Sequence, residues 1–535
     1  MKKRAFSKRY LISLDSQTFT HVFTDVLVIG SGVAGFSAAI KAAKYKSVLI
    51  VSKNKIDESS TAYAQGGIAV VMSEGDTIDK HTQDTLKTGQ GLCDAAAVKT
   101  IVTEGTKRVK ELIEWGAEFD KERNQLVFTQ EGGHLFPRII RAQGDSTGKE
   151  VECTLIRTAR DNKNITIFDH TFAIDLITKD NTCHGIIAWH KKKGHILVWA
   201  KQTILATGGC GQVYRETTNP PGATGDGVAM ACRAGVIIQD MEFVQFHPTT
   251  LYIAGATRFL ISETVRGEGG LLRNKREERF MPNYHPLAEL APRDVVSLSI
   301  LKEMQKTDDA YVYLDIRHIP QKKLYYRFPK IKEICASFGI DIARDLIPVR
   351  PSAHYMIGGI LVDLFCRTNI KRLYACGEVA CTGMHGANRL GSNSLLEGLV
   401  SGYTAGTTAS KSIKKPYKEF LPETISASSG LPGISRLNLH DMKNSLKSLM
   451  WRDAGIEREA KHLIDAQEMI GMWSTYVMDK EFSCPAGWEL QNMLLVSKLI
   501  VSSASERKES RGVHHRTDYP ETDNIHWKKH IKIKN

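Results

Sequence analysis

Residues 24–35 read TDVLVIGSGVAG, and this stretch decides the fold. Its apolar run, residues 26–29, is typical of a strand buried in a parallel sheet. Gly30, Gly32 and Gly35 follow in the G-x-G-x-x-G spacing. The first glycine permits a tight turn, the second lets a pyrophosphate approach the backbone, and the third lets a helix pack closely on the strand. The stretch therefore predicts a dinucleotide-binding site.

The residues after the glycines complete the expected βαβ unit. Residues 36–45 predict a helix whose first amides would face the phosphates, and VLIV at 48–51 predicts a second strand. An ordinary glycine-rich turn is the alternative interpretation, but it does not explain strand, glycines, helix and strand in this order. The second strand of an NAD site should end in Asp or Glu. Here Ser52 and Lys53 stand there and the first carboxylate is Asp57, which weakens NAD as the ligand and leaves FAD open.

The composition is that of an ordinary globular protein of several domains. The chain has 535 residues, of which 42% are hydrophobic and 24% charged, and this length favours about two to four domains. Lys and Arg number 72 against 59 Asp and Glu, for a net charge of +13. Such a charge would suit nucleic acid, an anionic surface or an acidic small molecule. Because the basic residues are mostly scattered, a generally basic proteome is the simpler explanation.

The cysteines and the N-terminus bear on metals and on location. No two of the ten cysteines form a C-x-x-C pair, so zinc and iron–sulfur ligation have no support and we expect no metal. The pattern suits a reducing compartment. Residues 1–10 are basic but no apolar segment follows, which argues against a secretory signal, and no long apolar run predicts a membrane span. We therefore expect a cytoplasmic protein, with a degenerate targeting segment at the N-terminus as the open alternative.

Three later segments have the form of FAD-binding elements. Residues 59–69 make a loop of small side chains, against which a flat ligand can lie. Residues 201–209, KQTILATGG, read as an apolar strand that ends in glycines, as in two-dinucleotide flavoproteins. Residues 368–378 fit the pattern T-x-x-x-x-apolar₃-x-G-E, in which Glu378 would reach the ribityl chain of FAD. The order of these segments after the first glycines predicts FAD as the cofactor.

We expect an α/β fold: a Rossmann-like FAD-binding domain with an inserted α+β capping domain and a C-terminal helical domain. The polar, motif-rich segment that begins near Phe246 interrupts the nucleotide domain. From about Leu437 the glycine motifs stop and apolar residues recur at helical spacing. The expected divisions are residues 22–245 with 354–415 for the FAD-binding domain, 246–353 for the cap and 430–535 for the C-terminal domain.

Six short motifs and the tail carry a resemblance to one family. The motifs are AQGGI at 64–68, FHPT at 246–249, RGEG at 266–269, PRD at 292–294, AHY at 353–355 and HGANR at 385–389, with the tail at 508–520. With them the chain resembles the succinate dehydrogenase and fumarate reductase flavoprotein family over nearly its whole length. Ser60 stands where succinate-type enzymes carry the histidine that is joined covalently to FAD, and EGGH at 131–134 matches the branch that oxidises L-aspartate.

This resemblance implies an FAD-dependent oxidoreductase that converts L-aspartate to iminoaspartate. FAD would be bound non-covalently, and dioxygen, giving hydrogen peroxide, or fumarate would accept the electrons. The reaction would be the first step of de novo NAD biosynthesis towards quinolinate, with a hand-off of the product to quinolinate synthase left open. No nucleic-acid partner is implied.

The resemblance also implies the residues of the site. Arg293 matches the proton-transfer group, and because the pKa of arginine exceeds about 12 it would need Glu268 or another carboxylate to relay the proton. A plain salt bridge is the alternative for Arg293, while Glu131 would pair with the substrate ammonium. The other substrate-site residues would be His247, Ser262, Glu263, Arg266, His354 and Arg389. The cofactor-binding residues would be Gly30, Ser31, Gly32, Val33, Ala34, Gly35, Lys53, Ser60, Thr61, Ala62, Tyr63, Ala64, Gln65, Gly66, Gly67, Asp226, Glu378, Ser394 and Leu395.

Three alternatives stay open. A soluble fumarate reductase or succinate dehydrogenase-type flavoprotein would use the same carboxylate clamps. A basic FAD-dependent protein that modifies tRNA would explain the charge and the glycines, but not the histidines and arginines at dicarboxylate positions. An inactive flavin-binding scaffold is favoured only by Pro137, which departs, as does Gln130, from the family pattern around Glu131.

Overall fold

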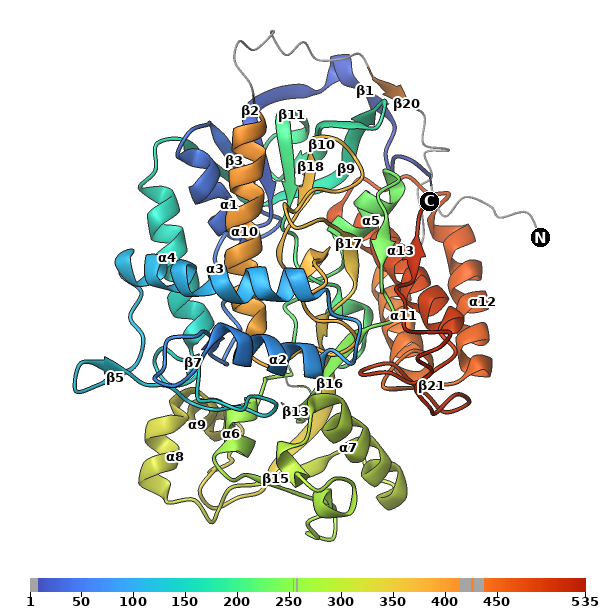
Figure 1. Cartoon of the computed structure of the whole chain (residues 1–535). Coiled ribbons are helices and arrows are strands. Elements are labelled where there is room, and N and C mark those ends of the chain that lie inside the picture. The colour runs from blue at the N-terminus through green and yellow to red at the C-terminus, as the bar shows by residue number, and fades with distance from the viewer. Residues whose placement is uncertain (1–7, 254, 256–257, 414–424, 428–436) are drawn as a thin grey trace.

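The computed structural model of the chain describes residues 8–253, 255, 258–413, 425–427 and 437–535 (Figure 1). The predicted domain limits at residues 415 and 430 lie outside these described residues. The described chain is built from a central sheet with helices on it, a second small sheet below, and a group of helices at one side (Figure 1).

The central sheet has seven strands and carries the glycine turn. Its strand order is β8-β3-β2-β11-β10-β9, with β18 also paired to β11. Strands β2, β3, β8, β11 and β18 are parallel, whereas β9, β10 and β11 form antiparallel pairs. Residues 26–28 are fully buried, which explains why they are uniformly apolar. The strands are β2 (Thr20–Ile29), β3 (Val48–Val51), β8 (Ile165–Phe168), β9 (Thr171–Lys179), β10 (Thr182–His190), β11 (Gly194–Leu205) and β18 (Leu373–Ala375).

Helix α10 (Asn393–Ser412) packs directly on α1 (Val33–Ala43), as Figure 1 shows. Three glycines one turn apart allow this, because a Cβ at Gly398, Gly402 or Gly406 would fall within 2.6 Å of α1 atoms. The start of α10 therefore lies beside the start of α1, next to the glycine turn. This brings two distant parts of the chain to one end of the site.

The segment from β13 to β16 forms a small sheet with its own apolar core, at the bottom of Figure 1. The sheet order is β13-β16-β15-β14, all antiparallel. In chain order, its first strand begins before residue 246 and its last strand ends after residue 353. Both predicted cap limits therefore fall inside strands, and the domain division itself stays a prediction. The elements are β13 (Val244–Leu251), α6 (Glu263–Gly267), β14 (Leu271–Arg273), α7 (Arg293–Thr307), β15 (Val312–Asp315), α8 (Gln321–Arg327), α9 (Pro329–Ser337) and β16 (Ile347–Met356).

Three helices form the C-terminal part: α11 (Leu439–Asp453), α12 (Ala460–Val477) and α13 (Pro485–Glu506). The helices end at Glu506, and the remaining residues to Asn535 contain only the short strands β22 (His515–Arg516) and β23 (Lys532–Ile533). The expected C-terminal helical domain is confirmed, and the tail after Glu506 forms its non-helical end. Charged side chains, which carry no helical periodicity, hold the tail in place.

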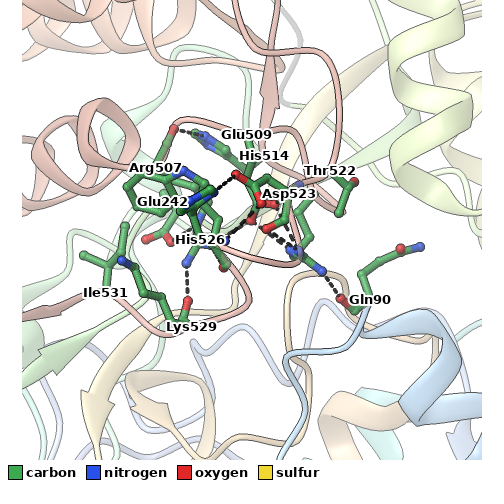
Figure 2. A network of polar contacts seen from close by, with 12 residues as sticks. Gln90, Glu242, Arg507, Glu509, His514, Thr522, Asp523, His526, Lys529 and Ile531 are labelled. Carbon is green, nitrogen blue, oxygen red and sulfur yellow. Dashed lines mark hydrogen bonds and ion pairs between the residues drawn. The ribbon is translucent and has the colours of Figure 1, made fainter.

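Figure 2 shows the polar network that fixes the tail. Arg507 donates to Glu242 at 2.7 Å and to Glu509 at 2.9 Å, and Arg511 donates to Glu509 at 2.8 Å. Arg511 also donates to the carbonyl of Gln90 at 2.8 Å, and this bond holds the tail against the loop that contains Gln90. We call these five residues the tail cluster.

The remaining described elements are short or peripheral. Among the described residues, no helix has the length and apolar character needed to cross a membrane. These elements are β1 (Leu14–Asp15), β4 (Ile68–Ala69), α2 (Ile78–Thr88), α3 (Ala95–Glu114), β5 (Lys121–Glu122), β6 (Gln125–Leu126), β7 (Ile139–Ile140), α4 (Thr147–Arg160), α5 (Asp226–Arg233), β12 (Ile238–Gln239), β17 (Gly359–Leu361), β19 (Ala380–Cys381), β20 (Ser426–Ala427) and β21 (Glu457–Arg458).

Candidate active site

One continuous cavity runs from the glycine turn of the central sheet to the small sheet. It collects residues from the N-terminal βαβ unit, from the loop at 59–67, from β13 and β16, and from the start of α10. Seven predicted substrate residues line it: Glu131, His247, Ser262, Glu263, Arg293, His354 and Arg389. The predicted cofactor residues on its wall are Gly30, Ser31, Gly32, Val33, Ala34, Lys53, Ser60, Thr61, Tyr63, Ala64, Gln65, Gly66, Gly67, Asp226, Glu378, Ser394 and Leu395.

Three predicted residues do not line this cavity: Gly35, Ala62 and Arg266. Gly35 acts through packing, because a Cβ there would lie 2.0 Å from the carbonyl oxygen of Gly30 and would push helix α1 off the strand. Arg266 lies behind Glu263 and donates to the carbonyl of Glu289 at 2.5 Å. The packing of Gly35 is the role that the glycine spacing predicted, and the roles of Ala62 and Arg266 stay predictions.

The glycine turn leaves room for a ligand against the backbone. Gly30 has φ +114°, and a Cβ there would lie 2.1 Å from the carbonyl oxygen of Ala206. A Cβ at Gly32 would be 3.3 Å from Thr61 Oγ1, so the cofactor loop closes over the turn. Only glycine keeps this approach open, which fits a pyrophosphate lying at the start of α1.

The far end of the strand holds a charge arrangement unlike that of an NAD site. Lys53 forms ion pairs with Asp226 and Glu489, each at 2.8 Å, and donates to Thr224 at 2.9 Å. Burial alone would lower the pKa of Lys53, but the two carboxylates hold it above its usual value. Because Lys53 faces carboxylates here, the end of β3 offers no acid for a ribose, in agreement with the sequence.

Glu378 is the acid on the opposite wall. It follows β18, and its Oε1 accepts from the backbone N–H of Met356 at 2.9 Å. Burial raises the pKa of Glu378 to about 7. A Cβ at Gly209, after β11, would be 2.2 Å from Glu378 Oε1, so the two strand ends meet here. A partly protonated carboxyl both donates and accepts, which fits the hydroxyls of a ribityl chain.

Two histidines face each other at the inner end of the cavity. His247 on β13 and His354 on β16 have ring centroids 5.2 Å apart. Thr218 Oγ1 lies 2.8 Å from Nδ1 of His354 and fixes its ring. Burial, with nearby arginines, holds the pKa of both histidines well below the usual range. Both are therefore neutral at neutral pH and act as directional hydrogen-bonding groups.

A glutamine that the sequence reasoning missed joins the two arginines of the site. Gln245 Oε1 accepts from Arg389 Nε at 3.1 Å and from Arg293 Nη1 at 3.3 Å. Its amide donates to the carbonyl of Arg389 at 2.8 Å. Gln245 is two residues before His247 on the same strand, so the period-two rule for strands would have placed both on one face.

Arg293 has a carboxylate partner, but it is not Glu268. Arg293 Nε donates to Glu263 Oε2 at 2.5 Å, and Arg266 lies 3.6 Å from the other oxygen. Burial would raise the pKa of Glu263, but these arginines hold it below its usual value. Glu268 instead pairs with Lys323 at 2.8 Å and Arg327 at 3.1 Å, so the expectation that it relays a proton for Arg293 is corrected.

Glu131 lies close to Arg293 and Glu263. Its Oε2 accepts from Ser392 at 2.8 Å, and its Oε1 forms an ion pair with Arg141 at 3.1 Å. A Cβ at Gly391 would lie 3.0 Å from Glu131 Oε2, 3.2 Å from Arg293 Nη2 and 3.5 Å from Glu263 Oε2. The two carboxylates and the arginine therefore converge around one glycine.

Comparison with known proteins agrees with this geometry. The FAD binding domain family matches residues 25–395, and the fumarate reductase flavoprotein C-terminal family matches residues 443–535. A solved structure of a mutant of E. coli quinol fumarate reductase FrdA has a TM-score of 0.87 at 31% identity, covering 96% of this chain and 94% of that one. A quinol-fumarate reductase with menaquinol molecules has a TM-score of 0.88 at 32% identity, covering 96% of each chain.

Curated relatives extend over nearly the whole chain. The chloroplastic L-aspartate oxidase of Arabidopsis thaliana is 41% identical, over 95% of this chain and 83% of its own. L-aspartate oxidase 1 of Ralstonia nicotianae is 44% identical, over 93% of this chain and 96% of its own. The Pseudomonas aeruginosa L-aspartate oxidase is 40% identical, over 95% of this chain and 97% of its own. The chain therefore belongs to the L-aspartate oxidase family, within the FAD-binding flavoproteins related to fumarate reductase.

Proposed function

We propose that this chain is an FAD-dependent L-aspartate oxidase, which forms iminoaspartate in the first step of de novo NAD biosynthesis towards quinolinate. Dioxygen, giving hydrogen peroxide, or fumarate accepts the electrons. The observation that carries the proposal is the convergence around Gly391, where Glu131 and Arg293 approach the same point of the cavity. A substrate with both carboxylates and an ammonium needs cations and an anion at one place. The names of the relatives support the same activity.

The carboxylates of the substrate meet a set of buried donors. Arg389 is buried, lies 4.3 Å from the ring centre of Tyr355, and among the described residues forms no ion pair with a carboxylate. Burial and the neighbouring Arg293 lower the pKa of Arg389 to about 10, so it is still a cation at neutral pH. A buried cation without a partner is costly, and an anionic ligand supplies the partner. We assign the second set of contacts to His247, His354 and Ser262.

Arg293 holds the position for proton transfer. Bound FAD supplies the hydride acceptor for the substrate Cα. Loss of that hydride leaves a C=N bond, and the substrate nitrogen gives up a proton. We assign the receiving atom to Nη2 of Arg293, which faces Gly391: the neutral arginine, with a proton missing from Nη2, takes up the substrate proton and becomes a guanidinium, whose Nε–H donates to the Glu263 carboxylate 2.5 Å away. Arg266 behind Glu263 keeps this carboxylate ionised between transfers.

Two finer proposals accompany this function. We propose that FAD is bound non-covalently, because the cavity wall carries Ser60 where a covalent attachment would need a nucleophilic ring nitrogen. Acid precipitation should release all yellow colour, and colour kept in the pellet would contradict this. We also propose a cytoplasmic location, supported by ten free cysteines, and direct use of the unstable imine by quinolinate synthase.

A soluble fumarate reductase is the second candidate function. The fold is shared with fumarate reductases, and His247, His354 and Arg389 would bind the two carboxylates of succinate or fumarate as well as those of aspartate.

Anaerobic mixing of the flavin-loaded protein with L-aspartate and, separately, with succinate decides between them. We expect L-aspartate to bleach the visible flavin absorbance and succinate to leave it. Reduction by succinate alone would establish the second candidate instead.

A further inference from the structure

Arg141 lies beneath the cofactor loop and beside the substrate end of the cavity. It directly follows β7, which pairs with β4 at the end of the loop that carries Gly66 and Gly67. A Cβ at Gly67 would lie 3.1 Å from Arg141 Cγ, so the arginine stem runs directly under this loop. Arg141 does not line the cavity, and the sequence reasoning gave it no role.

Its guanidinium is committed to one carboxylate. Arg141 Nη2 lies 3.1 Å from Glu131 Oε1, with side-chain exposures of 3% and 1%. Within the described part of the chain, Arg141 Nε has no hydrogen-bond partner, so the ion pair with Glu131 is what compensates this buried charge. Replacing one partner of a buried ion pair leaves the charge of the other partner uncompensated, so each of these two residues depends on the other.

The other groups around the pair determine what Glu131 would do alone. Ser392 and Thr264 approach its oxygens at 2.8 and 3.5 Å, and neither carries charge. The charged or titratable groups that face Glu131 are Glu263, Arg266 and Arg293 from α6 and α7, and His134 from its own loop. Arg327 and Glu268 face Arg141 from the other side. Arg141 contacts Glu131 at 3.1 Å and offsets the repulsion between this carboxylate and Glu263.

We propose that Arg141 is a positioning residue that holds the Glu131 carboxylate where it meets the substrate ammonium, and thereby sets the preference for an amino dicarboxylate over a plain dicarboxylate. The proposal rests on the proposed function. Without Arg141, the Glu131 carboxylate loses the ion pair that holds it in place. Succinate and fumarate have no ammonium, so their binding does not depend on the position of Glu131.

The test compares five variants with the wild type by kcat/KM for L-aspartate oxidation and for fumarate reduction with an artificial electron donor. Arg141→Met removes the charge of the arginine, Arg141→Lys keeps it, Glu131→Gln removes the charge of the carboxylate, and Glu131→Gln/Arg141→Met removes both charges. Arg108→Met is the matched control, since Arg108 is a buried arginine paired with Glu111 at 2.9 Å on α3, outside the cavity. Flavin content, thermal melting and the Kd for succinate from the flavin spectrum are measured on each.

We expect Arg141→Met to lower kcat/KM for aspartate about tenfold while fumarate reduction is kept, Arg141→Lys and Arg108→Met to keep the wild-type ratio of the two activities, and the double variant to be no weaker for aspartate than Glu131→Gln alone, because Arg141 acts through Glu131. The Kd for succinate stays constant or falls in Arg141→Met. Equal losses for aspartate and fumarate, or a double variant much weaker for aspartate than Glu131→Gln alone, would overturn the proposal. If Arg141→Met does not fold, the double variant, which leaves no unpaired charge, and Arg141→Lys apply the same criteria. A wild-type protein whose flavin aspartate does not reduce would refute the proposed function itself, whatever the variants do.

Discussion

Two buried clusters of arginines and carboxylates in the described chain, the tail cluster and the one in the cavity, differ in how completely their charges are paired. In the tail cluster of Figure 2, Glu509 accepts from both Arg507 and Arg511, and Arg511 also donates to Gln90 and Asn524. In the cavity, the Arg389 side chain donates one described hydrogen bond, to Gln245, and lies over the ring of Tyr355.

The difference separates a structural role from a binding role. Two buried ions stabilise a fold only when their attraction and hydrogen bonds offset the cost of removing them from water. The tail cluster meets this condition within the chain. Arg389 meets it only when an anion enters the cavity, so the incomplete cluster marks the substrate site.

The largest effect should come from Arg293, because it moves the proton. Arg293→Met should lower kcat by about 10²–10⁴, the usual contribution of a positioned acid or base, with flavin content and melting temperature close to wild type. Steady-state kinetics with L-aspartate measures it. If Arg293→Lys keeps most of kcat, the proton-transfer assignment is wrong and Arg293 is a salt-bridge residue.

Breaking the tail cluster should act on stability instead. Glu509→Gln leaves Arg507 and Arg511 short of a partner and should lower the free energy of unfolding by about 3–5 kcal/mol. Chemical denaturation followed by flavin fluorescence reports the loss. The KM of the folded fraction should stay near wild type, and a large KM change with unchanged stability would contradict the comparison.

Arg389 should separate from Arg293 in kinetics, since it binds the carboxylate in both the ground state and the transition state. Arg389→Met should raise KM about ten- to a hundredfold, the value of a charge-assisted hydrogen bond of about 1.5–3 kcal/mol, with a smaller change in kcat. Stability should hold or rise, because an unpaired buried cation is lost. A drop in stability as large as that of Glu509→Gln would place Arg389 among the structural residues.

The smallest effect concerns pH and the edge of the tail. Asp240 accepts from His530 at 2.6 Å and raises the pKa of this histidine. The pair therefore stabilises the fold fully below the usual histidine pKa of about 6.5, and the contribution is lost as the pH rises through the raised value. His530 is about one-third exposed, so up to about 1 kcal/mol is expected. Melting of His530→Gln against wild type at acidic and alkaline pH should show a gap only at the acidic end.

Patterns that are local in sequence predicted most of the fold. The predicted strand at 48–51 is β3, and the predicted helix at 36–45 overlaps α1. Each depends on hydrophobic periodicity and glycine placement over a few residues. Motifs of the same kind predicted the residues on the cavity wall, where Ala62 is absent and Gly35 packs behind the turn.

The parts that failed depend on pairing between distant side chains. Gln245 and Arg141 carry no motif of their own, and their roles exist only because Arg389 and Glu131 meet them in space. The sequence left open whether Glu268 or another carboxylate faces Arg293, since sequence spacing does not determine this pairing. Periodicity did not describe the tail after Glu506, because hydrogen-bonded arginines rather than an apolar stripe hold it.

The central claim is that a carboxylate within a cationic site selects the amino dicarboxylate, and Glu131→Gln tests it most directly. This variant keeps the shape and removes the charge. The measurement is the ratio of kcat/KM for L-aspartate oxidation to kcat/KM for fumarate reduction with an artificial donor. We predict that the ratio falls about ten- to a hundredfold, as expected for a charge-assisted contact of about 1.5–3 kcal/mol, with fumarate reduction kept or improved. An unchanged ratio, with both activities lowered equally, would contradict the account and make Glu131 a structural residue of its loop.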